Sequence, residues 1–310
     1  MHTLYTRINT GLLVFIALTG IVLVTMMATR AYGGPLDPPG PPASTMKTLQ
    51  QVEPRTPIVQ PGNVSEFPIT ISQPGSYYFT GNITGVLGKD GILINADNVT
   101  LDLNGFTLTT DERIAATVGI TDNSIGRTNL IVRNGIVRDW AKGVETPSSK
   151  NSTYEDLTVT DNRGDGMTIG SGSNLRRVTA RNNGNIGLRI MQIANTWGSI
   201  VEDSNFSGNG GWGIYFLANN VWVHHNIIDS NNRDGLWIPG SYAYNEITDN
   251  RITGNVGNGV VLFGNRNVVV RNVTDGNTAV GQFVDYGSGN IVGPLSPATS
   301  TNSNANIGIP

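Results

Sequence analysis

The sequence predicts an all-β solenoid, in which short strands wind into stacked coils. Three observations point to this fold class. An Asn recurs four residues before a Gly that opens an apolar–variable–apolar triplet. Successive Gly anchors are 21 to 28 residues apart, which is a typical length for one solenoid coil. The apolar runs hold 3 to 5 residues with a period of two, so they fit strands and are too short for helices.

The Asn and Gly repeat has six complete copies, and we expect their Asn side chains to stack into an amide ladder. These copies have their Asn and Gly at Asn162 and Gly166, Asn183 and Gly187, Asn209 and Gly213, Asn231 and Gly235, Asn255 and Gly259, and Asn277 and Gly281. Weaker copies begin at Gly91, Gly119 and Gly143. A second ladder is expected through Asn226, Asn250 and Asn272.

The triplet after each Gly assigns side chains to the two faces of a strand. Because side chains alternate along a strand, the first and third residues should point into the core and the second outward. The inward pairs are Ile92/Ile94, Met167/Ile169, Leu188/Ile190, Ile214/Phe216, Leu236/Ile238 and Val260/Leu262. The outward residues are Leu93, Thr121, Glu145, Thr168, Arg189, Tyr215, Trp237, Val261 and Phe283.

Composition bounds the classes of protein that this chain can belong to. It has 310 residues and no Cys, so stability must come from a buried core and not from disulfides. The net charge is −3 and only 14% of the residues are charged, which leaves no basic surface for nucleic acid.

The N-terminal residues predict export. Residues 1–10 are polar with one basic residue, Arg7, and residues 11–29 form an apolar run without charge. Small residues precede a candidate cleavage point after Ala31. Residues 1–31 are therefore a signal peptide or an uncleaved membrane anchor, and the protein is expected in the periplasm, outside the cell or on its surface. A Pro-rich linker follows over residues 32–62.

The rest of the chain divides into three parts. Residues 63–90 are expected to cap the first coil, with residues 67–84 forming a hairpin around Pro74 and Gly75. Residues 91–292 carry the repeats without a break, and residues 293–310 form a flexible tail or a C-terminal cover.

The short Asn-rich coils resemble right-handed, single-stranded parallel β-helix proteins of the pectate-lyase-like superfamily. They are most similar to the parallel β-helix repeat group of exported carbohydrate-binding proteins and sugar hydrolases. The resemblance covers roughly residues 90–292 and implies a β-helix of about nine coils. It implies a polysaccharide partner as well, although the repeat is specific for fold and not for function.

Seven residues on one side of the middle coils suit an elongated saccharide. They combine outward residues of the triplets with three residues that directly precede a Gly, and they are Glu145, Asp165, Arg189, Trp212, Tyr215, Asp234 and Trp237. Aromatic faces stack on sugar C–H surfaces, so Trp212, Tyr215 and Trp237 are the candidate carbohydrate-binding residues. The alternative is that parallel strands simply favour aromatic residues.

The charged members of this set, Glu145, Asp165, Arg189 and Asp234, are the candidate catalytic residues. Glycosidases need two carboxyl groups about 5–9.5 Å apart, which neighbouring coils could supply. β-Helix lyases instead need a basic residue that abstracts the proton α to a carboxylate of the substrate, with Ca²⁺ or another cation to neutralise that carboxylate. Arg189, flanked by Asp165, is a candidate for the base. The sequence lacks the motif set of polygalacturonases and the Asp-Pro-His of alginate epimerases. A lyase, hydrolase or epimerase activity and a non-catalytic structural or adhesive surface rod thus remain alternatives.

No cofactor is expected. Phosphate-loop motifs and Asp-x-Asp calcium repeats are absent from the sequence, and calcium remains an alternative without a supporting motif. His224 and His225 are adjacent, and as neighbours on a strand they should point to opposite faces and not share a metal. The oligomeric state is open, and a trimer is one alternative.

Overall fold

The computed structural model describes residues 12–21, 54–110, 117–196, 198–278, 281–296 and 305–308. The chain divides into two units, Met1–Glu53 and Pro54–Pro310. In the first unit, residues 12–21 form a helix, and no helix within the described ranges is long and apolar enough to cross a membrane. The candidate cleavage point at Ala31 and the Pro-rich linker as far as residue 53 lie outside the described residues.

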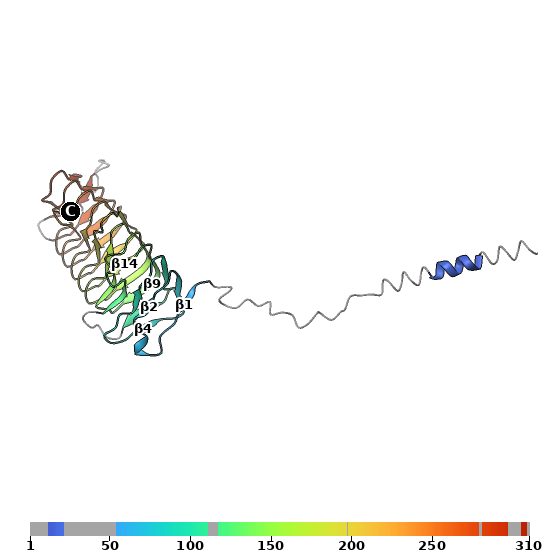
Figure 1. Ribbon diagram of the computed structural model, residues 1–310. Coiled ribbons are helices and arrows are strands. Elements are labelled where there is room, and N and C mark those ends of the chain that lie inside the picture. Colours follow the sequence, from blue (N-terminus) through green and yellow to red (C-terminus); the bar gives the residue numbers. More distant parts are fainter. Residues whose placement is uncertain are drawn as a thin grey trace, which may run out of the picture. The chain divides into compact units, whose positions relative to one another are not determined.

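The second unit is a stack of parallel coils, which confirms the predicted all-β solenoid (Figure 1). A narrow sheet contains one strand from each of ten coils. Its strands are β2 (Ile69–Ile71), β5 (Ile92–Ile94), β8 (Val118–Thr121), β10 (Lys142–Thr146), β12 (Met167–Gly170), β15 (Leu188–Met191), β18 (Ile214–Leu217), β21 (Leu236–Ile238), β24 (Val260–Leu262) and β27 (Phe283–Asp285). Strand β2 lies before the first Gly anchor, which is why there is one coil more than the nine expected.

A wide sheet contains the other twenty strands in two parallel rows. The first row holds β1 (Thr56–Ile58), β3 (Gly75–Phe79), β6 (Val99–Asp102), β13 (Asn174–Arg176), β16 (Ser199–Glu202), β19 (Val221–His224), β22 (Glu246–Thr248), β25 (Val268–Val270) and β28 (Ile291–Val292). The second row holds β4 (Ile83–Gly85), β7 (Thr107–Thr110), β14 (Thr179–Arg181), β17 (Asn205–Ser207), β20 (Ile227–Asp229), β23 (Arg251–Thr253), β26 (Val273–Asp275), β29 (Leu295–Ser296) and β30 (Asn306–Gly308). The long strands β9 (Ile131–Arg138) and β11 (Thr153–Thr160) run through both rows and join them.

The hairpin expected over residues 67–84 does not form. Strand β2 pairs in parallel with β5 of the narrow sheet, whereas β3 pairs in parallel with β1 and β6 of the wide sheet. The turn at Pro74 and Gly75 therefore connects two sheets of the first coil. An alternating pattern shows only that one face of each strand is buried, so it could not distinguish a hairpin from a coil.

The predicted inward side chains form the core. All six inward pairs are at most 2% exposed, and equivalent strands place like residues over like. One outward residue is wrong, because Phe283 pairs with inward Val260 and packs against the core. The cause is that Gln282, and not Gly281, takes the anchor position in the last coil. The N–H of Val260 donates to the carbonyl of Gln282 as the N–H of Leu236 does to that of Gly259.

The first Asn ladder forms as predicted, from Asn162 to Asn277. Each side-chain amide donates to the amide oxygen of the Asn one coil later, over 2.8–3.0 Å. The ladder has a distinct residue at each end. The N–H of Trp140 donates to Asn162 Oδ1 over 3.0 Å, and Asn277 donates to Gln282 Oε1 over 2.6 Å. The whole ladder is thus satisfied within the protein.

The second ladder, from Asn226 through Asn250 to Asn272, also forms as predicted. It ends at Asn306, whose Oδ1 accepts from Asn272 Nδ2 over 3.1 Å. Residues 305–308 of the expected tail or cover therefore add a strand and close this ladder. A third ladder through Asn245, Asn267 and Asn290 lies at another corner and was not predicted.

We predict that Asn231→Leu lowers the free energy of unfolding by about 1–3 kcal/mol. Asn231 is fully buried, and its amide bonds to Asn209, to Asn255 and to the carbonyl of Phe206. A leucine of similar size leaves those buried partners unpaired. Urea unfolding measures the effect. Asn232→Leu is the matched control, because the neighbouring Asn232 is exposed, and equal effects of the two changes would contradict the ladder's role.

Candidate functional site

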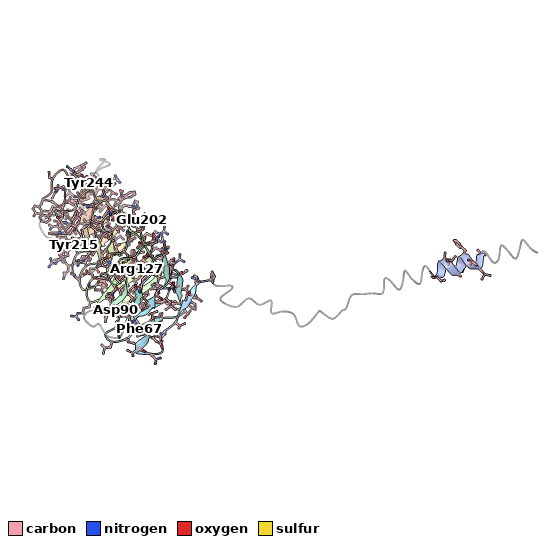
Figure 2. The ribbon with its side chains drawn as sticks, in the orientation of Figure 1. Phe67, Asp90, Arg127, Glu202, Tyr215 and Tyr244 are labelled. Atoms are coloured by element: carbon pink, nitrogen blue, oxygen red, sulfur yellow. The ribbon has the colours of Figure 1, made fainter. Side chains whose placement is uncertain are left out.

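The outward face of the narrow sheet changes in character along the stack. Its outward row runs in register through Thr121, Glu145, Thr168, Arg189, Tyr215, Trp237 and Val261. The early coils present polar side chains around Asp90, and the later coils present aromatic rings from Trp212 onward. Figure 2 labels Asp90 and Tyr215 at different levels of the stack. The surface of the early coils is the polar groove, and that of the later coils is the aromatic row.

The aromatic row consists of Trp212, Tyr215, Trp237, Phe263 and Tyr286. Trp212 stacks on Tyr215 with ring centroids 5.1 Å apart, and Trp237 lies 5.8 Å from Trp212. Phe263 continues the row at 5.1 Å from Trp237, and Tyr286 at 4.7 Å from Phe263. Phe263 is 38% exposed and Tyr286 is 63% exposed, so the row has a free surface on solvent.

Two charged residues of the next coil hold Trp212 in place. Its indole N–H donates to Asp234 Oδ2 over 3.0 Å. The guanidinium of Arg233 lies 4.5 Å from the centre of the Trp212 ring, within cation–π distance. Trp212 is therefore fixed at its edge and covered by a cation, and the rings beyond it are the more accessible part of the row.

The polar groove contains two adjoining cavities. The first, of about 490 Å³, is lined by Asp90, Val118, Thr121, Asn123, Ser124, Ala141, Lys142, Glu145, Arg163 and Gly164. The second, of about 400 Å³, is lined by Lys142, Glu145, Pro147, Gly164, Asp165, Thr168, Asn185, Arg189 and Met191. Lys142 Nζ lies 2.6 Å from Glu145 Oε2, and this ion pair is common to both cavities. The groove thus offers hydrogen-bonding groups of both charges.

Arg189 connects the groove to the aromatic row. Its Nη2 lies 2.8 Å from Asp165 Oδ2, and its guanidinium lies 5.5 Å from the centre of the Tyr215 ring. The Arg189 Nε is buried and has no hydrogen-bond partner. The guanidinium is thus held between a carboxylate and an aromatic face, with one donor unused.

The Asp residues before the Gly anchors bond to the neighbouring coil. Asp90 accepts the N–H of Val118 over 2.7 Å, Asp165 that of Ile186 over 3.2 Å, and Asp234 that of Asn258 over 2.7 Å. In each pair the donor is the equivalent residue one coil later. Burial raises the pKa of Asp90 above its usual value, although the bond from Val118 opposes this shift. These carboxylates therefore close the turns beside the site.

A family model described as "Right handed beta helix region" matches residues 143–293. The protein is a right-handed parallel β-helix. A solved structure agrees with that fold. The A-module of mannuronan C-5 epimerase AlgE6 from Azotobacter vinelandii aligns with a TM-score of 0.50 and 14% identity, over 77% of this chain and 89% of that one.

Two further structures are similar at lower scores. The A-module of mannuronan C-5 epimerase AlgE4 from Azotobacter vinelandii has a TM-score of 0.42 and 12% identity, over 76% of this chain and 91% of that one. The Dettilon tailspike protein gp208 has a TM-score of 0.44 and 12% identity, over 82% of this chain and 60% of that one. No curated protein sequence matches the β-helix chain.

The β-helix brings the predicted site residues together in two groups. Glu145, Asp165 and Arg189 line one cavity, whereas Trp212, Tyr215 and Trp237 form one aromatic cluster. Asp234 lies apart from the other carboxylates. Its two oxygens accept from Trp212 Nε1 and from the backbone and side chain of Asn258.

Phe263 and Tyr286 were not predicted as site residues. Both lie four residues after an anchor, at Gly259 and Gln282. Alternation along the strand turns that position outward as well, so an aromatic residue there was a usable signal. Lys142 was also missed as a site residue, although it belongs to the row of residues that precede the anchors.

The expected separation of His224 and His225 is wrong. Their Nδ1 atoms lie 2.9 Å apart on the wide sheet. Strand β19 ends at His224, and His225 has a φ of 57°, so strand alternation no longer applies between them. His225 is in register with Asp249 and Arg271, and all three take this left-handed backbone at the same corner.

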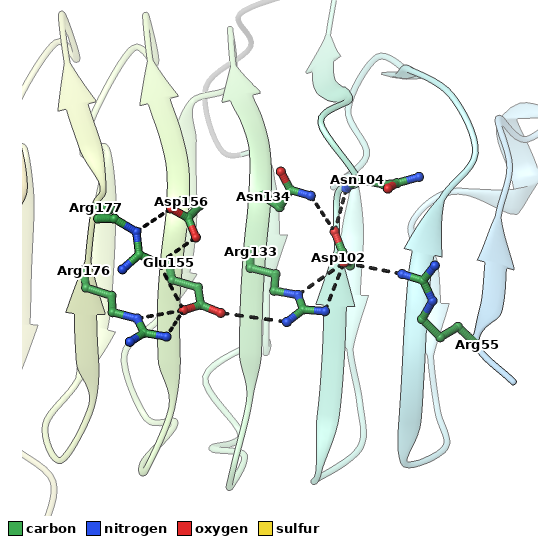
Figure 3. Close-up of polar contacts among 9 residues, drawn as sticks. All are labelled: Arg55, Asp102, Asn104, Arg133, Asn134, Glu155, Asp156, Arg176 and Arg177. Atoms are coloured by element: carbon green, nitrogen blue, oxygen red, sulfur yellow. Dashed lines mark hydrogen bonds and ion pairs between the residues drawn. The ribbon is translucent and has the colours of Figure 1, made fainter. Parts of the chain in front are cut away.

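The first row of the wide sheet carries paired charges of alternating sign (Figure 3). Asp102 lies 3.5 Å from Arg55 and 3.2 Å from Arg133, and Glu155 pairs with Arg133 and Arg176. At the adjoining corner, Asp156 pairs with Arg177 at 2.7 Å, which lowers the pKa of this carboxyl. These contacts leave the row with its charges matched, as in a solvated face, and exposed pairs of this kind contribute about 0–1 kcal/mol each.

We predict that Asp234→Ala lowers the free energy of unfolding by about 1–3 kcal/mol and changes the emission of Trp212. The change removes the acceptor of three donors, namely the Trp212 indole and the two Asn258 N–H groups. Chemical unfolding and tryptophan fluorescence measure the two effects. Asp229→Ala is the control, since this half-buried carboxylate accepts one bond, from the Ser230 hydroxyl. A loss no greater than the control's would argue against a structural role.

Proposed function

We propose that the outward face of the narrow sheet binds an extended polysaccharide. The observation that carries this proposal is the aromatic row, which has a ring on each of four successive coils, with ring centroids of neighbouring coils 4.7–5.8 Å apart. Neighbouring parallel strands are about 4.8 Å apart, which is close to the rise of one sugar unit along a chain. A saccharide that lies along the stack would therefore meet a new ring with each unit.

The polar groove supports the same proposal. A ligand that extends from the aromatic row past Arg189 reaches Lys142 and Glu145, whose charged groups bond sugar hydroxyls or carboxylates. The mannuronan C-5 epimerase A-module, named for its action on mannuronan, has the same fold. The β-helix fold is thus compatible with a polysaccharide partner.

The geometry favours binding over processing. The oxygens of Asp165 accept from Asn185, Ile186 and Arg189, and those of Asp234 from Trp212 and Asn258. Both carboxyl groups would have to give up these bonds to exchange protons with a substrate. Glu145, with its partner Lys142, is the remaining carboxylate of the set and the better candidate if the protein is a lyase, hydrolase or epimerase.

We predict that Trp237→Ala weakens glycan binding by about tenfold or more, because the change removes a central ring of the aromatic row. Binding is measured by calorimetry with the full chain and a panel of acidic and neutral polysaccharides. The matched control is Trp222→Ala, since Trp222 is 44% exposed but lies on the wide sheet.

Three outcomes decide between the candidate functions. Equal affinity in both Trp variants would remove the aromatic row as the binding surface. If no glycan binds, the alternative of a structural or adhesive rod is favoured. Turnover of a bound glycan that Glu145→Gln abolishes would establish processing.

We propose in addition that residues 1–31 export the chain, on the strength of their apolar run. The expected result is recovery of the β-helix outside the cytoplasm. N-terminal sequencing then distinguishes the two forms, since a cleaved signal leaves Tyr32 as the first residue and an anchor leaves the start intact in the membrane fraction. Recovery from the cytoplasm alone would contradict export.

A further inference from the structure

The two adjacent histidines of the wide sheet direct nitrogen atoms at each other. His224 Nδ1 and His225 Nδ1 are 2.9 Å apart, with the imidazole planes at 77°. His224 is buried under Trp222, whose ring centroid lies 4.2 Å away, and His225 is exposed. One imidazole is therefore fixed by packing, and the other is accessible from solvent.

Glu202 faces the second ring nitrogen of His224. Its Oε2 lies 3.4 Å from His224 Nε2, which is buried and has no hydrogen-bond partner. A proton on Nε2 would face the carboxylate, whereas a lone pair there would face it unfavourably. The favoured neutral form thus has its lone pair on Nδ1, where it accepts a hydrogen bond from His225 Nδ1–H when no metal is bound. A carboxylate behind an imidazole in this way is the usual second partner of a metal-binding histidine.

The surrounding charges favour a cation. In the corner row of left-handed residues, His225 lies between Asp203 on the preceding coil and Asp249 on the following one. Arg177 and Arg271 lie one coil further out on either side, where Arg271 bonds to Asp249 over 2.7 and 2.8 Å. With Glu202, three carboxylates lie on the coils next to the imidazole pair, whereas three guanidinium groups, those of Arg176, Arg177 and Arg271, lie one coil further out.

We propose that His224 and His225 together bind a divalent transition-metal ion, with Cu²⁺ preferred. With metal–nitrogen bonds of about 2.0–2.1 Å, two nitrogens at right angles are about 2.9 Å apart, against about 3.3 Å at a tetrahedral angle. The observed separation suits the square geometry of Cu²⁺ better than the tetrahedral geometry of Zn²⁺. Within the described ranges, no group of three His, Asp or Glu side chains is placed to hold a metal, so water completes the coordination.

The test uses the full chain without a polyhistidine tag and with His2→Ala, which leaves only the two histidines of the pair. Cu²⁺ is added in steps and followed by calorimetry and electron paramagnetic resonance. The expected result is one Cu²⁺ per chain, with a spectrum that shows two nitrogen ligands and with tighter binding than Zn²⁺.

Three further variants test the assignment. His225→Gln changes an exposed residue and should abolish stoichiometric binding without affecting the fold. Glu202→Gln should weaken Cu²⁺ binding by about tenfold or more, although it removes no ligand. Asp156→Asn is the control, because Asp156 occupies the same corner row three coils earlier and should leave binding unchanged.

The proposal is overturned if the His2→Ala chain binds no Cu²⁺ in stoichiometric amount. It is equally overturned if His225→Gln binds as tightly as the parent, because the metal then lies elsewhere. A Cu²⁺ spectrum with a single nitrogen ligand would exclude the pair as a shared site.

Discussion

The structure depends on amide-to-amide hydrogen bonds between equivalent Asn residues of successive coils. Every coil makes tight turns at its corners, and these turns bury backbone groups away from water. A buried donor or acceptor without a partner costs about 1–3 kcal/mol, so each corner needs its own supply of bonds. An Asn side chain meets this need, since it bonds the next Asn, the backbone of the same corner and a carbonyl of the core. The ladders thereby set the register that stacks the apolar triplets.

The same requirement governs the candidate site. At the corner beside the narrow sheet, Asp165 and Asp234 each accept the backbone N–H of the equivalent residue in the next coil. They thereby satisfy the turn as the Asn ladders do at the other corners. A carboxylate that closes a turn is poorly placed to take part in proton transfer. The aromatic row and Arg189 do not accept a backbone N–H of a neighbouring turn. Their side chains are therefore the ones to which we assign contact with a ligand.

The two sheets therefore have different surfaces. The wide sheet matches acidic and basic residues between successive coils, so its charges are largely satisfied within the protein (Figure 3). The narrow sheet instead carries partly exposed aromatic rings and one buried guanidinium donor without a hydrogen-bond partner. The imidazole pair interrupts the regular charge pattern of the wide sheet, because His224 and His225 each take a position at which the alternation of charges would place an Arg.

The sequence alone determined the solenoid, the facing of the triplets and the first two Asn ladders. These features recur in every coil, so strand alternation and the recurring Asn and Gly positions predict each coil from the one before it. Only the tertiary structure decided the features that break the repeat. Gln282 replaced Gly as an anchor, residues 67–84 entered two sheets instead of a hairpin, and His225 turned its ring towards His224. In each case the position of the side chain or strand depends on a partner in another coil or on a local left-handed backbone conformation. Neither can be inferred from the spacing of residues in the sequence.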